Sequence, residues 1–166
     1  MPGIHDTPPF RMEGRLTELV TVGLFADGIH MSNTFEGTIV TGTLQGAHVR
    51  GVDLFRIRPD GVGVIDAREL VTVGDQYMTA DVRGYAHPPP GLQMPPLEVV
   101  LDAGFTWPDV LFTIEAFVLY QTTVPELAEL THTAVVHLGS VNMATRELII
   151  EAHRAGAVRS GFAAST

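Results

Sequence analysis

One stretch of this sequence, residues 52–85, constrains the fold more than any other because its residue types alternate between two regular turns. Residues 58–61 (Arg-Pro-Asp-Gly) form a tight-turn pattern, since proline presets φ, aspartate caps the turn and glycine tolerates positive φ. Residues 74–75 (Gly-Asp) have the composition of a second, two-residue turn. The stretch therefore predicts three consecutive antiparallel strands with one apolar face and one charged face.

Two carboxylates fall on the predicted apolar face. The apolar members of that face are Phe55, Ile57, Ile65, Ala67, Val71, Met78, Ala80 and Val82. Asp53 and Glu69 share it, and a carboxylate in such surroundings has its charged form disfavoured, which raises its pKa and suits it to proton transfer near neutral pH. The alternative is that one or both lie at a rim and reach water. Glu115, inside the apolar run 111–120, is a similar case.

The charged face also has two interpretations. A turn at residues 74–75 places Asp66 opposite Arg83 and Arg68 opposite Asp81. These pairs either form a solvent-facing ladder of salt bridges, worth ~0–1 kcal/mol each, or line a polar mouth. In the second case Arg68 or Arg83 would hold an anionic or enolate oxygen.

Further strands are predicted on both sides of this stretch, at residues 15–21, 33–40, 41–50, 110–122, 133–141 and 147–153, with short helical pieces at 97–103 and 125–130. The proline-rich segment 87–96 is too stiff for the interior of a sheet or helix. It either covers a barrel end or serves as a ligand for a proline-recognising domain.

Many short strands joined by turns are typical of a sandwich or a barrel. We predict an all-β fold: a closed or nearly closed antiparallel β-barrel of about eight to nine strands with one or two short helical segments. The barrel is expected as a single domain over residues 13–154. An N-terminal arm (1–12) precedes it and a frayed C-terminal tail (155–166) follows it.

Composition excludes several kinds of chemistry. The net charge of −9 argues against nucleic acid, whose phosphates require clustered lysine and arginine. The sequence has no lysine for a Schiff base and no cysteine for a thiol nucleophile or a thiolate metal ligand. No two of its histidines have the i, i+2 spacing that puts two imidazoles on one strand face. We therefore expect no metal and no cofactor.

The first residues and the length of the apolar segments indicate where in the cell the protein is expected. The first residues lack a basic region followed by an apolar run, and no apolar segment approaches the ~20 residues of a membrane-spanning helix. We expect a cytoplasmic protein without a membrane partner, and a homodimer is expected only as the commonest oligomer.

Several short motifs resemble one family. They are Phe35-Glu36-Gly37, Gly42, Gly51-Val52-Asp53, Arg58-Pro59-Asp60-Gly61-Val62, Asp66-Ala67-Arg68 and Gly84-Tyr85-Ala86-His87-Pro88. This series is similar to a bacterial and fungal family of small proteins, domain of unknown function number three thousand two hundred thirty-seven. The resemblance spans about residues 15–154 and implies a β-barrel whose function is not established. It marks Asp53, Asp66 and Arg68 as recurrent polar positions.

The sequence departs from that family pattern at three places. Leu54 stands where an aromatic residue is expected, Glu69 where tyrosine is expected, and residues 131–133 (Thr-His-Thr) replace a Trp-Leu-Asn segment. These positions would line a cavity, so the resemblance implies a divergent pocket.

The leading functional hypothesis is an enzyme of secondary metabolism that holds an apolar, polyketide-like or terpenoid-like molecule inside the barrel. It would catalyse cyclisation, isomerisation or dehydration, with Asp53 and Glu69 in acid–base roles and Arg68 or His132 polarising an oxygen. The candidate substrate-binding residues are Asp66, Phe55, Tyr85, His87, Glu115 and His137. The alternatives are a barrel that binds a small molecule without turnover and a structural or interaction module.

Overall fold

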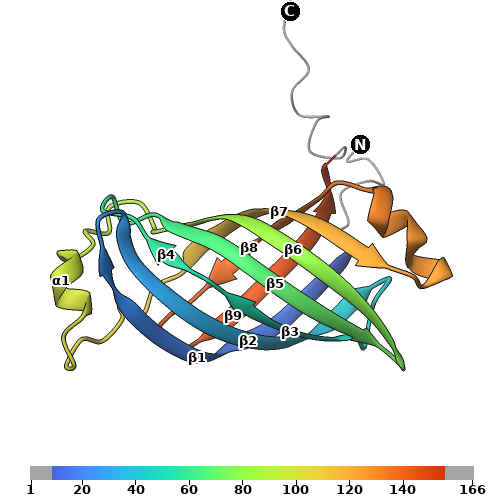
Figure 1. Ribbon diagram of the computed structural model, residues 1–166, viewed down its shortest axis with the longest axis horizontal. Helices are drawn as coiled ribbons and strands as arrows, with labels where there is room; N and C mark the ends of the chain where they lie inside the picture. The colour runs from blue at the N-terminus through green and yellow to red at the C-terminus, as the bar shows by residue number, and fades with distance from the viewer. Residues whose placement is uncertain (1–8, 156–166) are drawn as a thin grey trace, which may run out of the picture.

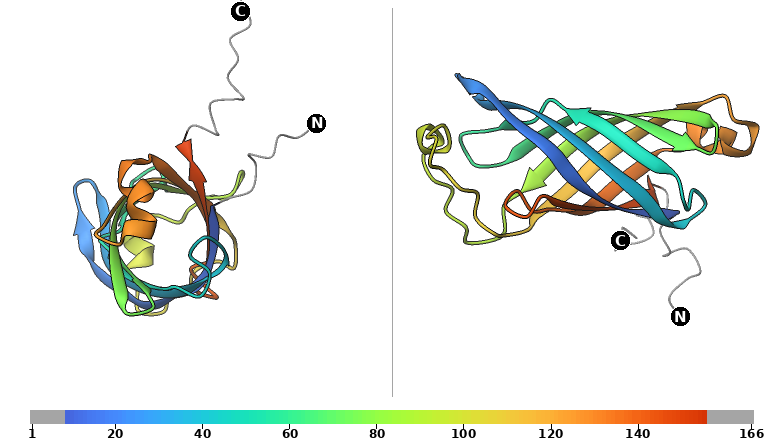
Figure 2. Two further views of the ribbon diagram at one scale, coloured as in Figure 1. Left: turned by 90° about the vertical axis from the view of Figure 1, so that its right-hand side faces the viewer. Right: turned by 90° about the horizontal axis from the view of Figure 1, so that it is seen from below.

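The computed structural model describes residues 9–155, which form a closed antiparallel β-barrel (Figures 1 and 2). Its eight strands are β1 (Phe10–Phe25), β2 (Gly28–Gly42), β3 (His48–Asp53), β5 (Gly63–Val73), β6 (Gln76–His87), β7 (Phe112–Thr122), β8 (Val135–Val141) and β9 (Glu147–Arg154). A two-residue strand, β4 (Arg56–Ile57), follows a break after β3 and pairs with both β2 and β5. The predicted fold class is confirmed.

The barrel has up-and-down topology. Each strand pairs with its neighbours along the chain, and β1 closes the ring by pairing with both β2 and β9. Closure leaves no open sheet edge along the paired length, so the backbone groups there are satisfied within the sheet. The side chains on the inner face form the core of the domain.

Strand β7 shows why this sequence closes around a core. Its residues alternate strictly between buried and exposed, with Phe112, Ile114, Ala116, Val118 and Tyr120 inside. Small residues face inward on several strands of the barrel, among them Ala67, Ala80, Ala86, Ala116 and Ala152. Because small side chains cannot fill a barrel of this size, space remains along part of its axis.

Both predicted turns in residues 52–85 are present. The Gly61 N–H donates to the Arg58 carbonyl (2.9 Å), and Val73 pairs with Gln76 on either side of the two-residue turn. The resulting register pairs Asp66 with Arg83 and Arg68 with Asp81, as predicted.

Short segments cover the two ends of the barrel (Figure 1). At one end lies the connection between β6 and β7, which carries α1 (Leu97–Val100); Met94, Phe105 and Trp107 of this connection pack against the core. At the other end lies the 3₁₀ helix η1 (Pro125–His132), with Leu127 buried. This arrangement supports the interpretation of the proline-rich segment as part of a cover.

The structure corrects several predicted boundaries. Strand β1 begins at Phe10, within the predicted arm, and runs past the predicted end to Phe25. Residues 43–47, in the middle of the strand predicted over 41–50, form the turn between β2 and β3, where Gly42 and Gly46 have positive φ. The helix predicted over 97–103 ends at Val100. Residues 1–8 and 156–166 of the predicted arm and tail lie outside the described residues.

Candidate functional site

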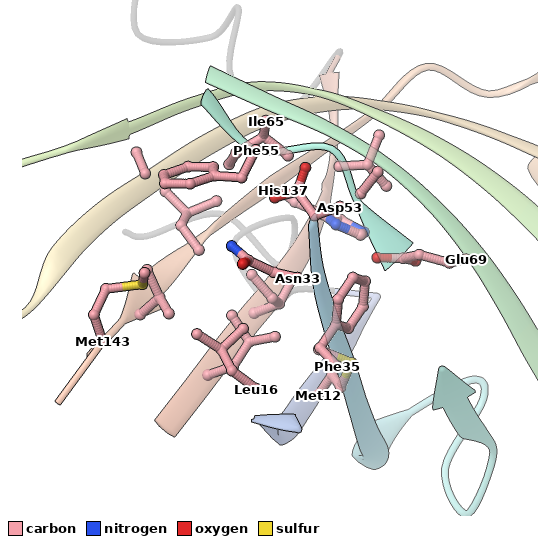
Figure 3. Close-up of a pocket in the computed structure, with 17 residues that line it drawn as sticks. Met12, Leu16, Asn33, Phe35, Asp53, Phe55, Ile65, Glu69, His137 and Met143 are labelled. Carbon is pink, nitrogen blue, oxygen red and sulfur yellow. The ribbon is translucent and has the colours of Figure 1, made fainter. Parts of the chain in front are cut away.

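A cavity inside the barrel is the candidate site (Figure 3). The cavity has a volume of about 70 Å³. When the space at its open mouth is also counted, about 610 Å³ around the lining atoms is free of protein. Most lining side chains are aliphatic or aromatic, and its polar lining residues are Asn33, Asp53, Glu69 and His137. None of the 17 described lining residues is an arginine. The cavity is thus an apolar space with a few polar groups, as small-molecule sites commonly are.

Asp53 ends β3 where the strand breaks before β4. Its Oδ1 accepts the backbone N–H of Asp66 (2.9 Å), while the Leu54 N–H donates to the Asp66 carbonyl (3.0 Å). One carboxylate oxygen therefore completes the ladder at the break. The other oxygen, Oδ2, makes no hydrogen bond among the described residues and is free for a ligand.

Glu69 lies near Asp53 on the same inner face. Asp53 is directly opposite Ala67, and Glu69 is two residues further along β5, which makes the two acids diagonal neighbours across the strand pair. Both residues are only partly enclosed because part of their surface faces the cavity. Neither carboxylate has a salt-bridge partner among the described residues.

Burial sets the proton affinity of this pair. It raises the pKa of Asp53 to about 7. The hydrogen bond from the Asp66 N–H lowers this pKa, and the charge of the Asp66 side chain raises it. Burial likewise raises the pKa of Glu69 to about 8, and the Asp53 charge adds to the rise. Both groups therefore titrate near neutral pH, and repulsion between the two neighbouring charges favours a state in which one acid is ionised and the other keeps its proton. The pair can therefore accept a proton at one group and donate one from the other.

A second polar pair lies on β7 and β8. The Tyr120 hydroxyl and His137 Nε2 are 2.8 Å apart, and both side chains are buried. Burial lowers the pKa of His137 to about 3, with a further decrease from His153, so the imidazole stays neutral. Burial, followed by the Glu69 charge, raises the pKa of Tyr120, so the phenol keeps its proton. The pair is uncharged at neutral pH.

Asn33 and Phe35 line the cavity from β2. Asn33 lies opposite Asp53 in the β2–β3 register and is 3% exposed, and its Oδ1 has no hydrogen-bond partner. The Phe35 ring lies over Gly51, where a Cβ would come within 2.4 Å of the ring. Glycine at position 51 therefore makes room for an aromatic wall.

Four of the predicted site residues meet in this cavity: Asp53, Glu69, Phe55 and His137. The carboxylates thus face the interior and not only a water-filled rim. Sequence reasoning did not select Asn33 or Tyr120. Alternation with Val118 on β7 could have placed Tyr120 inside, and alternation with Phe35 on β2 could have placed Asn33 inside, although neither shows which residue each would meet.

Arg68 and Asp66 lie on the outer face of the barrel, contrary to the roles predicted for them. Arg68 forms salt bridges with Asp81 (2.8 Å) and Asp66 (3.0 Å), and its side chain is 53% exposed. Strand alternation is the reason, because Arg68 and Asp66 have the opposite parity to Ala67 and Glu69 on β5. Arg68 therefore cannot polarise an oxygen in the cavity, and the charged block is a solvent-facing ladder.

The other predicted residues also lie outside the cavity. Glu115 on β7 and Tyr85 on β6 are exposed and pair with each other across the strands. His87 has the same outward parity as Tyr85, and their rings are 6.0 Å apart. His132 is exposed at the end of η1, which runs two residues beyond the predicted helical piece 125–130, and the strand predicted from residue 133 begins at Val135. Asp66 and Tyr85 share a depression, but on the outer surface.

Among the described residues, no group of three or more histidine, aspartate or glutamate side chains is arranged to hold a metal ion. Within residues 9–155, no helix is both long and apolar enough to cross a bilayer.

Comparison with known proteins shows the fold and leaves the activity open. A conserved protein of unknown function from Rhodopseudomonas palustris matches with a TM-score of 0.68 at 16% identity, over 93% of this chain and 99% of that one. A protein of unknown function from Clostridium acetobutylicum gives a TM-score of 0.70 at 16% identity, covering 89% and 95%. A protein from Acinetobacter baumannii described as β-barrel-like gives 0.68 at 18% identity, covering 89% and 93%.

No protein-family profile matches the sequence, and no curated protein matches it. These neighbours share the fold of this chain; two of them are described as proteins of unknown function and the third as β-barrel-like.

Proposed function

We propose that this protein is a small-molecule enzyme that performs acid–base chemistry on an apolar substrate inside the barrel. The observation that carries the proposal is the enclosure of Asp53 and Glu69 in one apolar cavity with no cationic partner among the described residues. Burying two acids costs free energy, and strongly perturbed carboxyl groups in a cleft are typical of catalytic sites.

In the proposed reaction, Asp53 Oδ2 removes a proton from a carbon next to a carbonyl group. The C–H bond breaks, its electron pair forms a C=C bond, and the carbonyl oxygen takes up the negative charge. The protonated Glu69 carboxyl hydrogen-bonds to that oxygen or transfers its proton to it. Return of the proton to another carbon gives isomerisation. Loss of a β-hydroxyl group, which takes the proton from Asp53 and leaves as water, gives dehydration. Attack of the new carbon nucleophile on a second carbonyl carbon of the same molecule, whose oxygen then takes that proton, gives cyclisation.

A polyketide-like or terpenoid-like substrate suits this cavity because such molecules combine apolar carbon skeletons with carbonyl groups. The resemblance to the family of unknown function noted in the sequence, the cytoplasmic location and the homodimer all stay predictions.

The second candidate is a binding protein without turnover. The apolar residues of the α1 connection and of η1 that pack at the barrel ends favour it, because they slow the exchange of a bound ligand with solvent. Asp53 also has a structural task at the strand break, which a non-catalytic barrel would need equally.

Metabolite profiling distinguishes the two candidates. The gene is deleted from its source organism and restored as wild type, Asp53→Asn, Glu69→Gln or, as an outer-face control, Asp81→Asn. Asparagine keeps the Oδ1 acceptor at the strand break, so the fold should survive. We expect a precursor to accumulate in the deletion strain and to be cleared only by wild type and Asp81→Asn. Clearance by Asp53→Asn would contradict the catalytic assignment, and an unchanged profile would favour the binding protein.

A further inference from the structure

The polar groups of the cavity differ in what they offer a ligand. Asn33 is almost fully buried, and its amide carries an oxygen that no described group satisfies. A buried amide without partners is costly unless a ligand or water completes its hydrogen bonds. Its position opposite Asp53, whose Oδ2 is also free, makes this wall of the cavity a place where a polar group of a ligand would be held.

On β7 and β8, the hydrogen-bond network assigns the proton of the Tyr120–His137 pair. The Tyr120 hydroxyl is buried, and His137 Nε2 is its hydrogen-bond partner among the described residues. A buried hydroxyl hydrogen needs an acceptor, so Tyr120 donates to Nε2. Because the imidazole is neutral, its hydrogen is then on Nδ1, which makes no hydrogen bond within the described chain. His137 therefore presents a free N–H donor, and Tyr120 is the residue that fixes this tautomer.

The charges of the cavity restrict the ligand further. Its lining contains two acids and, among the described residues, no arginine; the sequence has no lysine. A bound anion would lie near Asp53 and Glu69 in a low-dielectric space without a counter-ion, which is strongly unfavourable. The free donors on His137 and Asn33 instead suit the oxygen of an uncharged molecule.

From these contacts we propose that the cavity binds uncharged apolar molecules bearing a carbonyl oxygen, and that His137 Nδ1–H donates the hydrogen bond that recognises this oxygen. Tyr120 is a positioning residue that holds His137 in the donating tautomer. This inference rests on the proposed function and specifies its substrate class: ketones and related neutral carbonyl compounds, as opposed to carboxylates or phosphate esters.

Four aromatic probes of similar size test the proposal: acetophenone, ethylbenzene, benzoate and benzylammonium. Their dissociation constants are measured by NMR titration at pH 7.5 with wild type, His137→Phe and Tyr120→Phe. One hydrogen bond predicts that wild type binds acetophenone about five- to tenfold more tightly than ethylbenzene. Benzoate should bind at least about tenfold more weakly than acetophenone, because it brings a negative charge beside Asp53 and Glu69 without a counter-ion. Benzylammonium, whose charge an ionised Asp53 could pair, tests whether the cavity prefers a cation to a neutral ketone.

In His137→Phe the preference for acetophenone should fall to within about twofold, while ethylbenzene, which needs no hydrogen bond, reports that the cavity is still formed. In Tyr120→Phe the preference should weaken, and the ¹⁵N shifts of His137 should move from the Nδ1–H tautomer towards a mixture of tautomers. A merely structural role for Tyr120 would leave those shifts unchanged.

Other results would overturn the proposal. Tighter binding of benzoate or benzylammonium than of acetophenone would show that the ligand is charged. An undiminished ketone preference in His137→Phe would remove His137 as the donor, and failure of all four probes to bind wild type would remove the ligand class. The proposed enzyme is judged separately by the metabolite experiment, because that depends on Asp53 whereas ketone preference depends on His137.

Discussion

Neighbouring residues of β5 show how differently the two faces of this barrel treat the same side-chain type. Asp66 points outward and pairs with Arg68 and Arg83, with its side chain 37% exposed. Glu69, three residues later, points inward among apolar side chains and has no ion-pair partner within the described chain. The outer acid is solvated and paired, whereas the inner acid is neither.

Strand parity, more than residue type, therefore decides what a carboxylate can do in this barrel. Outer acids belong to a ladder of exposed ion pairs, which contributes little to stability. Inner acids lose their hydration, and their pKa rises into the range useful for proton transfer. Three experiments test this contrast between the two faces.

The largest effect is expected when a carboxylate is placed on each face of the same strand. Val118 is fully buried on β7, and its neighbour Leu119 is 54% exposed on the outer face. Val118→Asp should lower the free energy of unfolding by about 4 kcal/mol, because it removes core packing and buries an unpaired acid. Leu119→Asp should change it by less than about 0.5 kcal/mol. Urea denaturation monitored by circular dichroism measures both, and equal losses would contradict the contrast.

The next effect is a dependence of stability on pH. The folded-state pKa values of Asp53 and Glu69, about 7 and about 8, lie above the ordinary values of 3.8 and 4.5. The folded state therefore binds more protons than the unfolded state, so stability is greatest at low pH and is lost as pH rises through the folded-state values. Between pH 6.5 and 8.5 the loss should be of the order of 3 kcal/mol. His137, whose folded-state pKa of about 3 lies below its ordinary value of 6.5, acts in the opposite sense. It lowers stability as the pH falls below 6.5, which is outside the range of this measurement.

Matched variants assign this pH dependence. Glu69→Gln should remove more than half of the loss between pH 6.5 and 8.5, since a neutral amide has no proton to release. Asp81→Asn, on the outer face of β6, should leave the loss unchanged. Denaturation midpoints across pH measure all three proteins. A Glu69→Gln profile that overlays wild type would show that Glu69 ionises normally in the folded protein.

The smallest effect is expected on the outer ladder. Arg68→Gln breaks the salt bridges to Asp66 and Asp81, all three partners being substantially exposed. The expected loss is about 0.5–1 kcal/mol, and it should shrink further in high salt because the exposed charges are screened. Thermal unfolding at low and high salt measures it. A loss of several kcal/mol, insensitive to salt, would mean that the outer face carries a buried network.

Much of the contrast between the faces could be predicted from residues 52–85. A two-residue turn at residues 74–75 fixes the register, and the register fixes which side chains oppose each other. The two charged pairs follow from that one turn, the inward position of Glu69 follows from alternation with Ala67 and Val71, and that of Asp53 from the pairing of β3 with β5. Alternation along β7 would also have placed Glu115 outside and Tyr120 inside.

The rest of the site depends on features that no local pattern encodes. Asn33 faces inward because it alternates in step with Phe35 and Ile39, but its place beside Asp53 depends on the pairing of β2 with β3. His132 is excluded because a 3₁₀ helix occupies the segment before β8. The Tyr120–His137 hydrogen bond joins residues on adjacent strands, so it becomes visible only once the strand pairing is known.

The pairing of β1 with β9 has a consequence for how the chain can be rearranged. Phe10 lies opposite Ala152, so the first and last strands of the ring are side by side at the ends of the barrel segment. Neighbouring strands are about 5 Å apart, a gap that a short glycine–serine linker spans. With that link in place, the chain could begin at Asp75 and end at Gly74 without altering any strand neighbour. Circular permutation would then separate the Glu69 strand from its hairpin partner β6 in sequence while keeping them paired in space.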